Sequence, residues 1–513
     1  MELQSITSNF IPCFLVAAIL LTLIKELKRS QKTKTIQKLP PGPWKLPFIG
    51  CMHHLIGSLP HRCLKNLAQK YGSLMHLQLG EVSLIVVTSP NLAKEIMKTH
   101  DLSFATRPEL LAFKIICYDS KDIAFSPYGD YWRQMRKISV LELLSAKSVR
   151  SFENIRQDEV LHLVEAIRPL AGKKVNLTEQ VFSYASSMVC RAAFGQVSKE
   201  DQYEFVQLMK QVAALAGGFD IADLFPSYKI LHVLTGMKPK LLKIHHKMDS
   251  IFEKLIEEHI KNQTRNKKLV ADASQEDLID VLLRIRDSGN LQFPITNNNI
   301  KAIIFDMFAA GTETSSSTVE WAMSEMIRKP DVMAKAQREI RQAFKGKQNI
   351  DEADVQGLRY LKLVTKETLR LHPPFPLLLP RECREQCELN GYTIPIKTKV
   401  MINFWAIGRD PEHWSDPESF VPERFDNNLV DFTGNHFEFV PFGAGRRICP
   451  GMSFALVNVE LPLALLLCHF NWRLPDGMES KELDMLENNG ITATRKNNLY
   501  LVPSLYDPST DLE

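Results

Sequence analysis

The chain lacks the cysteine pattern of a disulfide-linked or zinc-binding protein. Its nine cysteines are odd in number and irregular in spacing, and no Cys-x-x-Cys pair occurs among its 513 residues. Disulfide frameworks and structural zinc sites are typically built from regularly spaced pairs. We therefore expect free thiols and a reducing compartment. The cysteines are Cys13, Cys51, Cys63, Cys117, Cys190, Cys383, Cys387, Cys449 and Cys468.

The chain also lacks an excess of charge of one sign beyond its N-terminus. Its net charge is +4, but residues 1–38 hold six of the 63 basic residues and two of the 59 acidic ones. The rest of the chain therefore carries 57 charges of each sign. Proteins that bind nucleic acid depend on clustered basic residues. We expect no nucleic-acid partner, and no internal repeat is visible.

An apolar run near the N-terminus predicts a membrane anchor. The uncharged run from Ile6 to Ile24 has 19 residues, close to the ~20 that span a bilayer core. A basic cluster follows it, which places the remaining chain in the cytosol by the positive-inside rule. A cleaved signal peptide would carry its basic residues before the apolar run. We expect residues 1–38 to be an uncleaved single-pass anchor, with a helix lying in the membrane interface as the alternative.

The sequence beyond the anchor predicts one large domain that is mainly α with a small β portion. Clustered prolines in residues 39–50 stop any helix and predict a stiff hinge, and residues 51–513 form the domain. A β-hairpin is expected within residues 74–90, around Gly80-Glu81. Apolar residues at helical spacing predict helices over residues 91–100, 158–171 and 243–261.

The longest predicted helix begins at Asn297, which can cap it, and ends before Pro330. Its centre, Ala310–Ser315, holds a glycine and several hydroxyls where a buried helix usually carries Leu or Ala. Glycine costs ~1 kcal/mol in a helix interior, and threonine can bond carbonyls three or four residues back. Two interpretations carry equal weight. The small residues allow close helix packing, or they form a polar notch that holds a diatomic ligand or water.

Two further sets of side chains share helix faces. Glu367 and Arg370 are three residues apart, with Arg424 later in the chain. As an exposed pair they would contribute little, whereas a buried cluster would be a specificity device that costs stability. Trp132 and Arg136 are four residues apart, and together they could bind a carboxylate or form an exposed cation–π pair.

The stretch "FVPFGAGRRICPGMSF" places Cys449 between a glycine-rich turn and the start of an apolar helix. A structural thiol needs no such surroundings, whereas a metal ligand does. Together the patterns resemble the cytochrome P450 haem-thiolate monooxygenases, and the resemblance covers nearly the full chain. The motifs that carry it are Trp132-x-x-x-Arg136, Ala310-Gly-x-Glu-Thr314, Glu367-x-x-Arg370, Pro422-Glu-Arg424-Phe and Phe442-x-x-Gly445-x-Arg447-x-Cys449-x-Gly451.

The resemblance implies the P450 fold, with the long central helix over haem b. Cys449 would be the axial thiolate, with a thiol pKa lowered by the following helix, and Phe442 would shield the sulfur. Thr314 and Glu313 would deliver protons during oxygen activation, with space left by Ala310–Gly311. The haem propionates would be bound by Trp132, Arg136, Arg381 and Arg447. A structural cluster would be formed by Glu367, Arg370 and Arg424.

The resemblance also implies the reaction and its partners. One atom of O2 enters a small hydrophobic substrate, and the other is reduced to water. Electrons come from NADPH through NADPH–cytochrome P450 reductase at the endoplasmic reticulum membrane. Helix spacing and the resemblance together predict a substrate pocket of Leu111, Phe113, Ile303, Met307, Ala310, Phe375, Leu378 and Ile491. By helix spacing alone, Asp306 is the alternative to Met307 on the face of Thr314.

The sequences of several long stretches are similar to those of plant microsomal P450s that hydroxylate terpenoids. This resemblance favours a sesquiterpene as substrate. One alternative is hydroxylation of another terpene class, an indole alkaloid or a flavonoid. A different class of enzyme, a haem-thiolate isomerase or dehydratase that needs no external electrons, is the second alternative.

Overall fold

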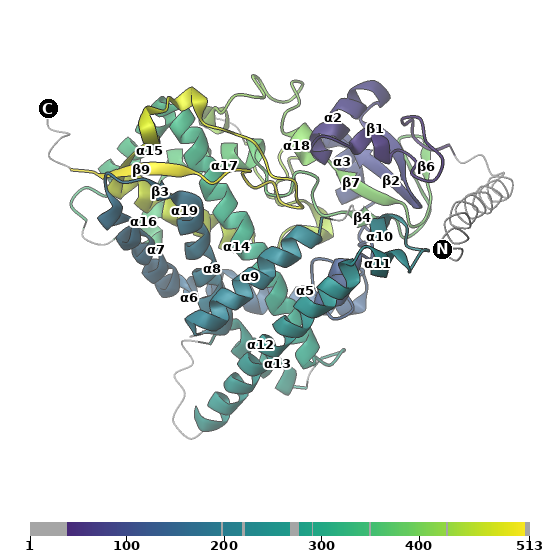
Figure 1. Cartoon of the computed structure of the whole chain (residues 1–513), viewed down its shortest axis with the longest axis horizontal. Coiled ribbons are helices and arrows are strands. Elements are labelled where there is room, and N and C mark those ends of the chain that lie inside the picture. The colour runs from purple at the N-terminus through teal and green to yellow at the C-terminus, as the bar shows by residue number, and fades with distance from the viewer. Residues whose placement is uncertain are drawn as a thin grey trace, which may run out of the picture.

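The computed structural model describes residues 38–195, 198–217, 221–266, 276–289, 291–347, 350–426 and 429–507. The predicted anchor, apart from its last residue, lies outside this part of the chain. Figure 1 shows a sheet-rich end around β1, β2 and β7 beside a larger helical part that α14 crosses. The predicted class, mainly α with a small β portion, is confirmed.

The helices, in chain order, are α2 (Pro60–Tyr71), α3 (Pro90–Lys94), α4 (Leu111–Ile116), α5 (Asp130–Ile138), α6 (Ala146–Ser151), α7 (Glu153–Ile167), α8 (Leu177–Phe194), α9 (Lys199–Leu215), α10 (Ile221–Leu224), α11 (Leu231–Leu234), α12 (Met237–Asn266), α13 (Leu278–Asp287), α14 (Asn297–Arg328), α15 (Pro330–Ala343), α16 (Glu352–Gln356), α17 (Arg359–Leu371), α18 (Phe404–Ile407) and α19 (Met452–His469). The strands are β1 (Leu74–Leu79), β2 (Val82–Val87), β3 (Val175–Asn176), β4 (Arg381–Glu382), β5 (Cys387–Leu389), β6 (Tyr392–Ile394), β7 (Lys399–Ile402), β8 (Phe470–Arg473) and β9 (Tyr500–Leu505).

The strands form three small sheets. The largest has the order β1-β2-β7-β4, the second β3-β9-β8, and β5 pairs with β6 alone. The predicted hairpin is confirmed, because β1 and β2 pair antiparallel with Leu79 opposite Val82. Gly80 makes its turn at a φ of 57°, a conformation that favours glycine. The three helices predicted from periodicity correspond to α7, α12, and α3 with the π-helical turn η2 (Glu95–Thr99).

The long central helix α14 is confirmed, with one correction at its start. Thr296 is the N-cap, and it forms a capping box with Asn299, so Asn297 is the first helical residue rather than the cap. The amide oxygen of Asn299 accepts from the Thr296 backbone N–H at 2.8 Å, which satisfies a donor that a cap at Asn297 would leave free. The helix ends at Arg328, and Pro330 begins α15. Its 32 residues reach ~48 Å at 1.5 Å per residue.

Packing around α14 forms the core of the helical part. The helix contacts α8, α12, α13, α15, α17 and α19. A Cβ atom added at Gly311 would lie 3.1 Å from Cγ2 of Val189 on α8. Glycine at this position therefore lets α8 approach closely, so the packing interpretation of the small residues holds at Gly311.

Among the described residues, α19 is long and apolar enough to cross a membrane. More than half of its apolar window is buried within the protein, and it packs against α7, α14, α15 and α17. These contacts make α19 a core helix, and its N-terminus follows Cys449 directly.

Candidate active site

The loop that carries Cys449 folds back on itself. The backbone N–H of Cys449 donates to the carbonyl of Phe442 at 2.9 Å. Gly443 and Gly445 adopt left-handed φ values of 70° and 68°, which other residues rarely adopt. A Cβ atom at Gly445 would lie only 2.0 Å from the carbonyl oxygen of Met97. Glycine at position 445 therefore lets this loop pass close to η2, which carries Met97.

The thiol of Cys449 lies at the N-terminus of α19. Gly451 caps this helix, and its backbone N–H bonds the sulfur. Burial raises the pKa of the Cys449 thiol, and the N–H of Gly451 and the charge of Arg136 offset this only in part. The predicted lowering by the helix start is present through Gly451, but burial outweighs it in the free thiol. A metal cation at the sulfur would supply the missing positive charge.

One cavity joins this thiol to the centre of α14. It has a volume of about 340 Å³, and both Cys449 and Thr314 line it. Phe442 also lines the cavity beside the thiol. The sequence places these residues more than a hundred positions apart, and the fold brings them to one space.

Four arginine side chains surround the same cavity: Arg107, Arg136, Arg381 and Arg447. In the described part of the chain, only Arg381 has a carboxylate partner, Asp101 at 3.0 Å. The other three donate to backbone carbonyls.

The buried carboxylate of Asp122 offsets the mutual repulsion of these guanidinium groups only in part. Burial and then the charges of Arg447 and Arg381 hold the pKa of Arg107 well below its usual value. Burial and the charge of Arg381 lower the pKa of Arg447 to about 9. Buried charges of one sign are normally paired with an opposite charge. The arrangement therefore fits a dianionic ligand whose carboxylates reach these arginines and whose metal reaches Cys449.

Trp132 supports the arginines from outside the cavity. Its indole N–H donates to the carbonyl of Ile123 at 3.1 Å, and the guanidinium carbon of Arg447 lies 4.2 Å from its ring. Arg447 donates to the same carbonyl at 3.0 Å. A direct bond from Trp132 to the anion stays a prediction.

The centre of α14 provides the polar groups opposite the thiol. The hydroxyl of Thr314 donates to the carbonyl of Ala310 at 2.5 Å, which is the backward bond expected of threonine. Glu313 lines the cavity beside it. Burial raises the pKa of Glu313, and a hydrogen bond from Thr492 and the charge of Lys210 lower it in part. A carboxyl group that holds its proton more tightly than usual can serve as a proton donor.

Six of the eight predicted pocket residues line this cavity: Phe113, Met307, Ala310, Phe375, Leu378 and Ile491. Leu111 and Ile303 do not, and their assignment is corrected. Ile303 lies 11 residues from Thr314 along the helix, or ~16 Å, which is beyond the end of the cavity. At that position it is fully buried in the core. Leu111 is the first residue of α4, where it is partly buried against the apolar core and its backbone N–H donates to Asp223.

The sequence interpretation missed Arg107. It also missed the hydrogen bonds of Asp306, which it gave only as the alternative to Met307 on the face of Thr314. The Asp306 carboxylate accepts from the backbone N–H groups of Ile123 and Ala124. Burial and the nearby charge of Asp122 raise its pKa well above the usual value. A single charged residue within the apolar run "IIFDMF" was the available indication.

The buried cluster of Glu367, Arg370 and Arg424 forms as predicted. Arg370 makes two hydrogen bonds of 2.8 Å with the Glu367 carboxylate, and both side chains are fully buried. Arg424 donates to the same carboxylate at 3.0 Å. These residues do not line the cavity. Their contacts instead hold α17 to the turn that carries Arg424.

A mainly α fold with a cavity between a loop thiol and a central helix, and with buried arginines around it, defines a haem-thiolate protein. The sequence matches the family described as Cytochrome P450 over residues 40–502. It is 62% identical to premnaspirodiene oxygenase of Hyoscyamus muticus, over 98% of this chain and 99% of that protein. It is 58% identical to 5-epiaristolochene 1,3-dihydroxylase of Nicotiana tabacum, again over 98% and 99%.

The fold is also similar to solved structures. A zebra fish cytochrome P450 structure with progesterone gives a TM-score of 0.75 at 25% identity and covers 87% of this chain and 100% of that one. The chain belongs to the cytochrome P450 family. It is a monooxygenase with haem b as cofactor, and electrons reach it from NAD(P)H through a reductase. Its substrate is a small hydrophobic molecule. The predicted family, fold and cofactor are confirmed.

Proposed function

We propose that this cytochrome P450 hydroxylates a plant terpenoid and that its favoured substrate is a sesquiterpene. The observation that carries the proposal is the apolar wall of the cavity between the thiol and α14. Phe113 stacks on Phe125 there, with ring centroids 3.5 Å apart, and Phe375 and Leu378 line the same space. The high identity to the two named oxygenases supports a hydrocarbon substrate of this class.

In the proposed site, bound haem would supply the activation of oxygen. Cys449 would ligate the iron, and Arg136, Arg381 and Arg447 would bind the propionates, with Trp132 close to them. Arg107 fits the same role, because it is buried among these arginines without a carboxylate partner in the described chain.

The residues of α14 would hold and transfer protons on the side of the cavity opposite Cys449. The hydroxyl of Thr314 and the carboxyl of Glu313 would hold and pass protons, and Ala310 would leave room for the substrate. Phe442 would cover the sulfur and limit the access of water. Phe113, Met307, Phe375, Leu378 and Ile491 would orient the hydrocarbon by contact.

We also propose that NADPH–cytochrome P450 reductase of the endoplasmic reticulum is the electron donor and that residues 1–38 anchor the chain there. The apolar run and its basic flank support this topology. Residues 39–50 would be the hinge and residues 51–513 the cytosolic catalytic domain. Removal of residues 1–38 should move the protein from the microsomal pellet toward the soluble fraction, and unchanged pelleting would contradict the anchor.

Coexpression with the reductase in microsomes and a panel of sesquiterpenes, other terpenes, indole alkaloids and flavonoids tests the substrate. Spectral shifts and hydroxylated products with sesquiterpenes alone would support the proposal. Turnover of only alkaloids or flavonoids would overturn it. Conversion that proceeds without NADPH would instead favour the isomerase or dehydratase alternative.

The role of Cys449 has a test that does not depend on the substrate. Cys449→Ala should abolish the red-shifted carbon-monoxide band of a thiolate-bound haem. The corresponding control, Cys468→Ala on α19, should keep it. A retained band in Cys449→Ala would contradict the assignment of the ligand.

A further inference from the structure

A second pair of thiols lies outside the cavity, at the bend between β4 and β5. Cys383 follows β4, and Cys387 is the first residue of β5. Cys383 is fully buried and Cys387 is half-buried, and both pack in the same apolar cluster. Neither lines the cavity that holds Cys449, so the pair has no part in the chemistry described above.

Backbone and side-chain contacts bring the two sulfur atoms together. The Cys383 sulfur lies 3.9 Å from the carbonyl oxygen of Ile394, and Ile394 is the residue directly opposite Cys387 in the β5–β6 pair. Cys383 is also 2.9 Å from the carbonyl oxygen of Glu385, within the bend itself. The Cys383 sulfur therefore lies beside the first residue pair of this hairpin, which contains Cys387.

The backbone around Cys383 is fixed from both sides. Its N–H donates to the carbonyl of Thr398 at 2.9 Å, and its own carbonyl accepts from Lys397 at 2.7 Å. A bond between the sulfurs would close a loop of only five residues, 383–387, in a bend that already exists. The two thiols thus approach in the folded chain without a large rearrangement.

The environment gives the two thiols different chemical character. The hydrogen bond from Cys383 lowers the pKa of Cys387, although burial opposes this. The same contact, followed by burial, raises the pKa of Cys383 well above its usual range. Thiolate character and exposure determine which cysteine reacts with oxidants. Cys387, the more exposed of the two thiols, is therefore the nucleophile, and the buried Cys383 lies beside it.

We propose that Cys383 and Cys387 form a peroxide-responsive dithiol. The sulfur of Cys387 attacks one oxygen of hydrogen peroxide, the O–O bond breaks, and Cys387 becomes a sulfenic acid while the other oxygen leaves as water. The sulfur of Cys383 then attacks the Cys387 sulfur, its proton leaves with the hydroxyl group as a second water, and a disulfide forms. Peroxide accepts the two electrons that the thiols lose. A low-molecular-weight thiol such as glutathione reverses the step by exchange.

The bend lies against the segment that supports the arginines of the active site. The N–H of Arg384 donates to the carbonyl of Ser103 at 2.8 Å, and the Ser103 hydroxyl donates to Glu385 at 2.8 Å. Arg381, two residues before Cys383, bonds Asp101 and the carbonyl of Ala444. The dithiol is therefore attached to the active-site frame but stays chemically separate from the Cys449 thiol.

Peptide mapping of the haem-loaded protein after graded hydrogen peroxide tests the proposal directly. Trypsin cleaves after Arg381, Arg384 and Lys397, so the disulfide would join residues 382–384 to residues 385–397. We expect this linked peptide in the wild type, its loss on treatment with dithiothreitol, and its absence from Cys383→Ser and Cys387→Ser. Cys63 and Cys468 are half-buried cysteines elsewhere in the chain. The matched controls Cys63→Ser and Cys468→Ser should still form the linked peptide.

A second measurement separates the dithiol from a folding defect. Phenylarsine oxide binds two neighbouring thiols, and we expect it to protect both residues from alkylation in the wild type but not the partner left in either single variant. The reduced carbon-monoxide spectrum of each sample reports whether the haem site is intact. In protein with an intact spectrum, oxidation of Cys63 to a sulfinic acid before any linked peptide forms would overturn the proposal.

Discussion

Asp306 on α14 accepts hydrogen bonds from the backbone N–H groups of two successive residues, Ile123 at 2.6 Å and Ala124 at 3.1 Å. Both residues line the cavity, and the carbonyl of Ile123 is also held by Trp132 and Arg447. One carboxyl group thus fastens the segment over the cavity to the central helix. Burial and the charge of Asp122 raise the pKa of Asp306, and its contacts with the two N–H groups make it an acceptor of hydrogen bonds.

The stability of an Asp306 variant should therefore depend on whether the new side chain keeps a hydrogen-bond acceptor. Asp306→Asn keeps a carbonyl oxygen, and we expect near wild-type stability. Asp306→Ala leaves two buried N–H groups without a partner, at about 1–3 kcal/mol each. Hydrogen exchange at residues 123 and 124 and the thermal midpoint measure the difference. Glu109→Ala, on an exposed side chain before α4, is the control, and equal losses in Asn and Ala variants would contradict this account.

Arg107 should contribute to retention of the cofactor. Its guanidinium group is buried beside the cavity and donates to the carbonyls of Ala124, Leu379 and Pro380. Loss of one charge-assisted hydrogen bond to a propionate costs about 1.5–3 kcal/mol, so Arg107→Gln should lose haem roughly ten- to a hundredfold faster. Transfer of haem to apomyoglobin measures the rate.

The control for Arg107 is an arginine of the same region that faces solvent. Arg133 on α5 is more than half exposed and pairs with Asp130. Arg133→Gln should leave the rate of haem loss unchanged. Equal rates for the two variants would remove Arg107 from the cofactor site.

The sequence predicted those parts of the site whose residues lie close together in the chain. Glu367 and Arg370 are one helical turn apart, so a shared face follows from the sequence alone. Cys449 is identifiable because its glycines and the following helix are its immediate neighbours. Thr314 is identifiable for the same reason, since the small residues around it interrupt an apolar helix.

The parts that the sequence did not predict depend on contacts between distant segments. Arg107 is held by carbonyls near residues 124 and 380, and no local spacing indicates such a partner. Ile303 shares a face with Thr314, but periodicity gives only the angle around the helix and not the depth at which the cavity ends. The N-terminus of α14 was misplaced by one residue because Asn297 and Thr296 are both good caps, and the Asn299 amide decides between them.

Thr314 should control the efficiency of turnover rather than the binding of haem. Thr314→Ala should keep the carbon-monoxide spectrum but consume NADPH with little product, because a proton donor at α14 is lost. Thr314→Ser keeps a hydroxyl and should restore most of the coupling between NADPH use and product. Thr318→Ala, one turn further along α14, is the matched control and should remain coupled. Full coupling in Thr314→Ala would contradict the proton role.

The buried pair of Glu367 and Arg370 should make a large contribution to stability. Glu367→Gln leaves the two guanidinium groups of Arg370 and Arg424 without a negative charge, and breaking a buried pair costs about 3–5 kcal/mol. Thermal unfolding of the haem-loaded protein should show this loss. The exposed pair of Arg284 and Glu276 provides the control, since Glu276→Gln should change stability by less than about 1 kcal/mol. Similar effects of the two substitutions would contradict the structural role of the cluster.

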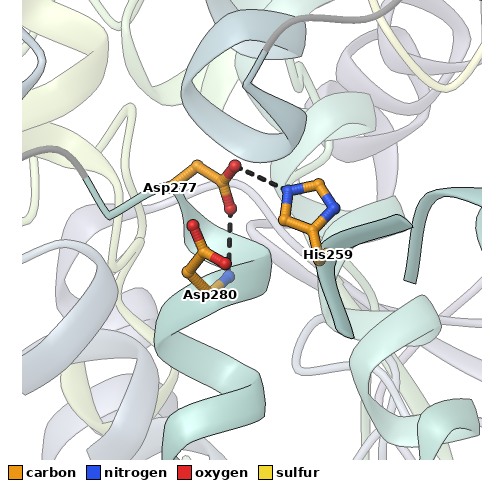
Figure 2. A group of neighbouring side chains, drawn as sticks. All are labelled: His259, Asp277 and Asp280. Carbon is orange, nitrogen blue, oxygen red and sulfur yellow. Dashed lines mark hydrogen bonds and ion pairs between the residues drawn. The ribbon is translucent and has the colours of Figure 1, made fainter. Parts of the chain in front are cut away.

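A histidine far from Cys449 joins two helices. Figure 2 shows His259 of α12 facing Asp277, while Asp277 caps α13 through the backbone N–H of Asp280. His259 contacts Asp277 at 2.8 Å through Nε2, and its Nδ1 contacts the carbonyl of Leu255 at 2.7 Å. Both ring nitrogens face acceptors, so only the doubly protonated imidazolium satisfies both contacts. Burial alone would lower the pKa of His259, but the hydrogen bond and charge of Asp277 raise it to about 9.

The raised pKa of His259 predicts a stability that falls with pH. The folded protein holds this proton up to about pH 9, whereas the unfolded chain releases it near pH 6.5. The contribution, no more than about 3 kcal/mol, is complete below pH 6.5 and is lost as the pH rises to about 9. The thermal midpoint of His259→Gln should therefore lie below that of the wild type at pH 6 and approach it above pH 9. His162→Gln, at an exposed histidine beside Glu159, should show a small difference at every pH, and a gap that persists in His259→Gln above pH 9 would contradict the charged pair.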